Sequence, residues 1–126
     1  MTMTSVSFDF QKSVAYDDVR KREFHRLARR QLGLLAKALD LPPGSFDLRS
    51  NMAGIAVSGE ITMHAEDIYV QASQPFGGFD TGILIRTCKG RKDYTGGPNN
   101  FTSLDLLREP DRLARMVRLV LERDRP

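Results

Sequence analysis

The residues best suited to bind a ligand lie together between positions 86 and 100. Cationic side chains can neutralise phosphates, an exposed tyrosine can stack on a base, and asparagine amides can read base edges. This segment carries four cations, one tyrosine and two asparagines: Arg86, Lys89, Arg91, Lys92, Tyr94, Asn99 and Asn100. The combination predicts contact with nucleic acid, although the same residue types also make an ordinary hydrophilic loop.

A second cationic set is predicted on the first helix. Its members are Arg22, Arg26, Arg29 and Arg30. Their spacing places them on the helix face opposite the apolar residues. They could extend a nucleic-acid surface, or they could form a plain solvated face.

Three side chains are candidates for catalysis or metal binding: His25, His64 and Cys88. Neither histidine has another ligand type at metal-binding spacing, and His64 is predicted on a strand surface. Nearby cations would lower the pKa of the Cys88 thiol, whereas a small apolar residue at a strand end is the simpler interpretation. A dyad of Cys88 with His64 would require adjacent strands. We therefore expect no catalytic residues, no metal and no cofactor.

The length of 126 residues predicts one domain, spanning positions 1–126. No apolar run approaches the roughly 18 residues that a membrane helix requires, and the first residues do not resemble a secretory signal. Cys88 is the only cysteine, so no internal disulfide can form and a reducing cytoplasm is expected.

The net charge of +3 is unevenly distributed along the chain. Positions 41–85 hold one arginine against five acidic residues, and basic residues dominate both flanks. This pattern predicts a nucleic acid or an acidic protein surface as the partner, and no membrane. It does not predict an oligomeric state.

The first helix is expected to begin near Tyr16, with Asp17 or Asp18 as its N-cap, and to stop at Pro42-Pro43-Gly44. Gln31 falls within its apolar face. That position requires either a buried hydrogen-bond partner or a groove in place of a core. Residues 1–15 form either an edge strand or, as we favour, a tail pinned by its aromatic rings.

Alternating apolar residues predict strands at 45–50, 55–64, 68–73 and 82–89. In the second of these, Ile55, Val57, Ile61 and Met63 should face the core, and Gly59 suggests a bulge or a close crossing of backbones. Residues 65–67 should form the turn of an antiparallel hairpin. The strand at 82–89 is expected to be central and covered on both sides, and 90–102 is expected to be irregular.

A last helix should follow Pro110, because apolar residues recur there at helical spacing. The element order predicts an α+β fold: an antiparallel β-meander of three to five strands with an N-terminal and a C-terminal amphipathic helix packed on it. Both helices are expected on one face of the sheet, and opposite faces are the alternative.

The function that fits these features best is a small non-enzymatic nucleic-acid-binding module that uses the basic loop after the last strand. The alternative is a protein–protein accessory or inhibitor protein. It would use the strand face around Tyr69 and Gln71, or the loop carrying Phe76 and Phe79, whose rings we expect to fold back onto the sheet edge. In its general look the chain is similar to small proteins of phages or mobile elements, and no residue role follows from that likeness.

Overall fold

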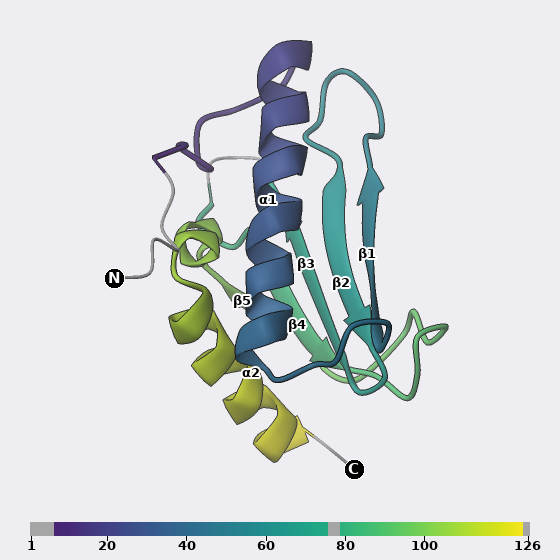
Figure 1. Ribbon diagram of the computed structural model, residues 1–126. Helices are drawn as coiled ribbons and strands as arrows, with labels where there is room; N and C mark the ends of the chain where they lie inside the picture. Colours follow the sequence, from purple (N-terminus) through teal and green to yellow (C-terminus); the bar gives the residue numbers. More distant parts are fainter. Residues whose placement is uncertain (1–6, 76–78, 125–126) are drawn as a thin grey trace.

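The computed structural model describes residues 7–75 and 79–124. Within them the elements are α1 (Asp18–Ala38), β1 (Phe46–Asn51), β2 (Glu60–Ala65), β3 (Ile68–Ser73), β4 (Ile83–Thr87), β5 (Asn100–Thr102), the 3-10 helix η2 (Leu104–Arg108) and α2 (Pro110–Asp124). The strands form one antiparallel sheet in chain order, so the predicted α+β class is confirmed (Figure 1). The predicted helix placement fits in part, because α1 begins only at Asp18 and a further segment precedes it.

The two ends of α1 are set by local hydrogen bonds. Asp17 is the N-cap, and its Oδ1 accepts a hydrogen bond from the Arg20 amide at 3.0 Å. At the other end Asp40 has a φ of 59°, and the Leu41 amide donates to the Ala36 carbonyl at 3.0 Å. This is a Schellman ending, so the helix stops four residues before the prolines that were predicted to stop it.

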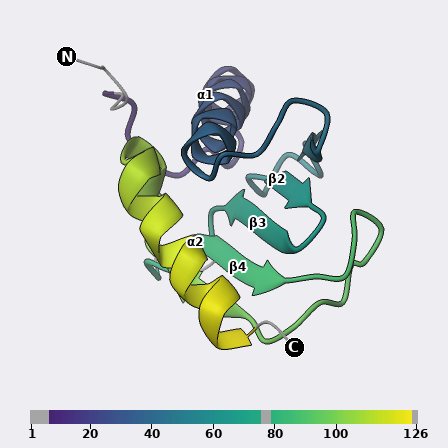
Figure 2. The ribbon, with the colours of Figure 1, turned by 60° about the horizontal axis from the view of Figure 1, so that its bottom comes forward.

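One hydrophobic core lies between the sheet and both helices. Alternate strand residues such as Met63, Val70 and Ile85 are fully buried and share a cluster with Leu35 of α1 and Val117 of α2. Figures 1 and 2 show the two helices on the same side of the sheet. The alternative with helices on opposite faces is therefore wrong.

The segment before α1 packs against this core without forming a strand. Phe10 and Val14 are fully buried. The Gln74 side chain holds the backbone of both residues: its Nε2 donates to the Phe10 carbonyl at 2.8 Å, and its Oε1 accepts from the Val14 amide at 3.0 Å. Residues 7–15 are therefore held against the core, and no strand lies among them.

The second strand starts later than predicted. β2 begins at Glu60, and Ile55 is 74% exposed and not part of the core face. Gly59 has a φ of 71°, and a Cβ there would lie 2.1 Å from the Asn51 carbonyl oxygen. Of the two interpretations of this glycine, the close crossing of backbones is therefore the one observed.

Three further expectations are corrected. β4 does have a strand on each side, β3 and β5, but Leu84 is only half-buried, so β4 is not covered on both faces as expected. The segment expected to be irregular up to residue 102 ends in β5, which pairs with β4 through Leu84 and Phe101. Phe79 is 70% exposed and does not fold back onto the sheet, while Phe76 lies outside the described residues.

Gln31 does find a buried partner, because its Nε2 donates to the Leu107 carbonyl at 2.7 Å.

Candidate nucleic-acid interface

The sheet has a second face, on the side away from the helices, which we call the open face. Residues opposite each other in an antiparallel sheet project from the same face, and neighbours along a strand alternate. Register therefore places His64, Tyr69 and Arg86 in one row. A second row follows it. Its members are Arg49, Thr62, Gln71, Leu84 and Phe101.

Two arginine side chains lie against tyrosine rings in and beside the first row. The Arg86 guanidinium lies 4.3 Å from the centre of the Tyr69 ring, and its NH2 donates to the Tyr94 carbonyl at 2.6 Å. The Arg49 guanidinium lies 5.5 Å from the centre of the Tyr94 ring. Tyr94 itself is 59% exposed. These contacts hold the Tyr94 ring in place while most of its surface faces solvent.

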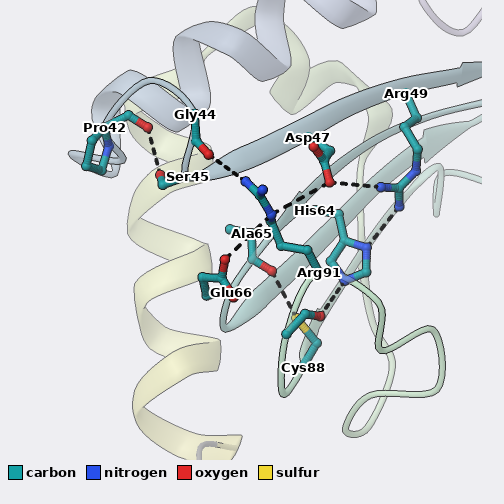
Figure 3. Close-up of polar contacts among 11 residues, drawn as sticks. Pro42, Gly44, Ser45, Asp47, Arg49, His64, Ala65, Glu66, Cys88 and Arg91 are labelled. Atoms are coloured by element: carbon teal, nitrogen blue, oxygen red, sulfur yellow. Dashed lines mark hydrogen bonds and ion pairs between the residues drawn. The ribbon is translucent and has the colours of Figure 1, made fainter.

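His64 is the buried centre of this arrangement, and its predicted surface position is wrong. Its Nδ1 lies 2.9 Å from Arg49 NH2, and its Nε2 lies 3.0 Å from the Gly90 carbonyl oxygen (Figure 3). A guanidinium can only donate, so Nδ1 must accept and the proton must sit on Nε2, which donates to Gly90. Burial, followed by the charge of Arg49, lowers the pKa of His64 and keeps the ring neutral.

The segment from Gly90 to Asn99, which we call the 90–99 loop, is ordered by one carboxylate. Asp93 accepts hydrogen bonds from the amides of Lys89, Thr95 and Gly96 at 2.9, 3.1 and 3.1 Å. These hydrogen bonds hold the pKa of Asp93 well below its usual range, and the bond from the Gly96 amide lowers it most. Gly96 also approaches β4 so closely that a Cβ would lie 2.5 Å from the Thr87 carbonyl oxygen. The loop is therefore a folded rim of the open face.

Two of the cations predicted to bind a ligand hold the fold together. Arg91 donates to the Gly44 carbonyl at 2.7 Å, and its Nε lies 3.5 Å from Glu66 and 3.8 Å from Asp47 (Figure 3). Arg86 is engaged with Tyr69 and Tyr94, as described above. Their side chains thus fasten the 90–99 loop to the sheet.

The remaining residues of the predicted segment divide into two groups. Asn100 lies in β5, where its Nδ2 donates to the Ile85 carbonyl at 3.2 Å and to Asp124 at 3.0 Å. Lys89, Lys92 and Asn99 have exposed side chains. Of the predicted segment, Lys89, Lys92, Tyr94 and Asn99 thus remain exposed, while Arg86, Arg91 and Asn100 are held in contacts within the protein.

The helix arginines do not join this surface. Arg29 and Arg30 are exposed on α1, Arg22 pairs with Asp18 at 2.7 Å, and Arg26 pairs with Glu23. Because α1 packs on the other side of the sheet, the sheet separates these arginines from the open face. The two cationic sets predicted from the sequence are two separate surfaces.

The candidate catalytic groups are held in structural contacts. Cys88 is buried, its thiol donates to the Ala65 carbonyl at 3.4 Å, and burial raises its pKa, which agrees with the favoured structural interpretation and not with the alternative of a lowered pKa. β3 lies between β2, which holds His64, and β4, which ends one residue before Cys88, so these two strands are not adjacent. His25 is buried with its Nε2 2.7 Å from the Ser58 carbonyl oxygen. In the described ranges, no three His, Cys, Asp or Glu side chains gather as a metal site would need.

Sequence reasoning missed the part that Arg49 plays in this site. Arg49 supports both Tyr94 and His64. A signal existed in principle, because Arg49 alternates with apolar Leu48 on a strand that pairs with the strand of His64. The pairing register was needed to use that signal.

Comparisons with known proteins add no assignment. No protein-family model matches the chain, and neither the curated proteins nor the solved structures yield a match. Neither helix in the described part of the chain is long and apolar enough to cross a membrane. A function must therefore be inferred from the geometry of this chain's own residues.

Proposed function

We propose that this protein binds single-stranded nucleic acid on the open face of its sheet, with the 90–99 loop as the rim of the site. The observation that carries the proposal is the Tyr94 ring, which is held by Arg49 and His64 and yet is 59% exposed. An ordered, exposed aromatic ring is a stacking platform for a base.

The shape of the site favours a single strand over a duplex. A base can stack on Tyr94 only if it is not already stacked between neighbours in a paired helix. The platform lies on a sheet, and no helix of the described residues projects from that side to enter a major groove. Recognition would therefore use the faces of unpaired bases.

Charge around the platform supports binding of a phosphate backbone. Lys89 and Lys92 are exposed next to and in the loop, and Arg49, whose guanidinium lies 5.5 Å from the centre of the Tyr94 ring, is partly exposed. The nearest acid of β1, Asp47, lies 3.6 Å from Arg49 and 3.8 Å from Arg91, so two cations offset its charge. With Glu66 and Asp93 counted beside Asp47, these three acids face four cations, Arg49, Lys89, Arg91 and Lys92, which leaves a small net positive charge.

The experiment is a fluorescence-anisotropy titration of the full chain with short labelled single-stranded DNA and RNA, and with the matched duplex, at several salt concentrations. We expect the single strands to bind more tightly, and affinity to fall as salt rises. Replacing Tyr94 with Leu, which keeps apolar contact with His64, should weaken binding about fivefold or more. Absence of binding at low salt, or equal binding by the duplex, would refute the proposal.

A matched pair of charge variants locates the surface. Lys89→Gln with Lys92→Gln removes two exposed charges at the rim, and Arg29→Gln with Arg30→Gln removes two exposed charges from α1. Only the first variant should flatten the salt dependence, by roughly 0.7 in log–log slope for each phosphate contact on a single strand. An equal effect of both variants would indicate non-specific attraction.

A second candidate function is the protein–protein accessory role, and Phe79 favours it. This ring is 70% exposed and borders a cavity of about 620 Å³ that Gln74, Asp80 and Asp105 also line. An exposed ring beside a hollow is typical of a docking site. A pull-down with and without nuclease separates the candidates, because only a protein partner would survive nuclease treatment.

A further inference from the structure

The outward side of α2 carries an apolar residue between two unpaired charges of opposite sign. Arg115, Leu119 and Glu122 follow helical spacing and form one stripe, which we call the α2 ridge. All three are exposed, Leu119 at 63%. Within the described part of the chain, neither Arg115 nor Glu122 has a hydrogen bond or ion pair, although the other arginines of α2 do.

The α2 ridge borders a groove at the edge of the sheet. The groove has a volume of about 410 Å³, and Phe101, Met116, Leu119 and Val120 line it. Phe101 is 57% exposed, so two large exposed apolar side chains meet at one place. Exposed apolar residues are ordinary singly, but two of them beside a groove mark an association surface.

The strand beneath this groove is the last in the sheet, and it is short and uncharged. β5 consists of Asn100, Phe101 and Thr102, none of them charged, and only β4 pairs with it. Proteins commonly place charges or proline on an exposed edge to prevent pairing with other chains. The opposite edge, β1, carries Asp47 and Arg49.

We propose that this surface binds a second copy of the same chain around a two-fold axis near Leu119. The argument for a second copy is charge complementarity. Arg115 lies four residues before Leu119, and Glu122 lies three residues after it. When two α2 helices pack antiparallel with their Leu119 residues opposite each other, Arg115 of one copy lies near Glu122 of the other. The two positions differ by one residue, or about 1.5 Å along the helix axis. Two ion pairs then flank a central contact between the two Leu119 side chains.

A two-fold axis explains why the charges occur in this order. An isologous interface brings residue i of one copy against residue j of the other, and j against i. Arg115 of each copy meets Glu122 of the other copy, and Leu119 of one copy meets Leu119 of the other, so all three residues satisfy this condition. The groove beside Phe101 then receives the apolar residues of the second copy, and Lys89, Lys92 and Tyr94 do not line it.

The test is the mass of the full chain measured by sedimentation equilibrium from low to high micromolar concentration, without nucleic acid. We expect the mass to rise from the 14.2 kDa of the monomer toward twice that value. Arg115→Glu should weaken the dimer by roughly tenfold or more, because two attractive contacts become repulsive. Arg115→Glu with Glu122→Arg should restore it, because the exchanged charges are again complementary.

Leu119→Asp provides a second measurement, since it places two like charges at the axis and should leave only monomer. Far-UV circular dichroism of each variant checks that α2 is intact. If Leu119→Asp loses its fold, the charge-reversal pair alone decides the question. A wild-type mass that stays at the monomer value overturns the proposal, and so does a dimer that Arg115→Glu leaves unchanged or that the double exchange does not restore.

Discussion

The buried neutral His64 predicts that stability falls in mildly acidic solution. Protonation would place a donor on Nδ1, where Arg49 NH2 already donates from 2.9 Å, so the bond between the two side chains would be lost. It would also add a buried charge close to Arg49 and Arg86. The native state therefore resists protonation, which is why the pKa of His64 is lowered. The pKa of His25 is lowered too, mainly by burial.

The sign and size of the effect follow from proton linkage. Unfolded histidine has a pKa of about 6.5, so below that pH the unfolded chain takes up protons that the native chain refuses, and the free energy of unfolding decreases. The contribution of the neutral histidines to the free energy of unfolding is fully present above about pH 7.5, and it is lost as the pH falls toward their native pKa. Between pH 6.5 and 5.5 each histidine contributes a loss of at most about 1 kcal/mol, hence at most about 2 kcal/mol for both.

The assay is urea unfolding at about pH 7.5, 6.5 and 5.5, a range above the titration of the carboxylates. His64→Gln is the informative variant, because its amide can accept from Arg49 and donate to the Gly90 carbonyl without titrating. It should remove about half of the pH dependence, and His25→Gln should remove the other half. A wild-type stability that does not change over this range, or a His64→Gln variant with the full pH dependence, would refute the neutral buried histidine.

Three further outcomes are expected. Arg91→Ala should lower the melting temperature while Lys92→Ala should not, because only the Arg91 side chain bonds to neighbouring segments; equal melting temperatures would contradict this assignment. Gly59→Ala should destabilise the protein by more than about 1 kcal/mol in urea unfolding, since its backbone has a positive φ and its Cβ would collide with the Asn51 carbonyl; a neutral effect would mean that this crossing is not tight. Gln31→Leu should cost about 1–3 kcal/mol by the same assay, because it leaves a buried carbonyl without its donor, and a gain in stability would argue that packing dominates there.

Much of the fold could be predicted because local patterns determine it. The apolar spacing of α2 and the N-cap at Asp17 are short-range signals, and the starts of both helices were located to within two residues. The hairpin of β2 and β3 follows from two alternating runs separated by Glu66 and Asp67. Of the two alternatives that the sequence left open at Gln31, a buried hydrogen-bond partner or a groove, the partner is observed, and the sequence could not identify it as the Leu107 carbonyl.

The parts that could not be predicted depend on contacts between distant segments. β5 is three residues long and has no pattern of its own, so only its pairing with β4 reveals it. His64 alternates as a surface residue would, and it is buried because the 90–99 loop folds over it. Arg91 looks like a free loop cation until β1 and the turn after β2 supply its two acidic partners.

The chain-order arrangement of the sheet has a consequence for how this protein folds. Each strand pairs with its neighbours in the chain, and the longest connection between paired strands is the twelve residues 88–99, so closing the loops of the sheet costs a modest amount of chain entropy. Packing of α1 against α2, by contrast, joins segments from opposite ends of the described chain. Topologies dominated by local pairing fold quickly. If the helices dock late, substitutions in their contact should accelerate unfolding far more than they slow folding.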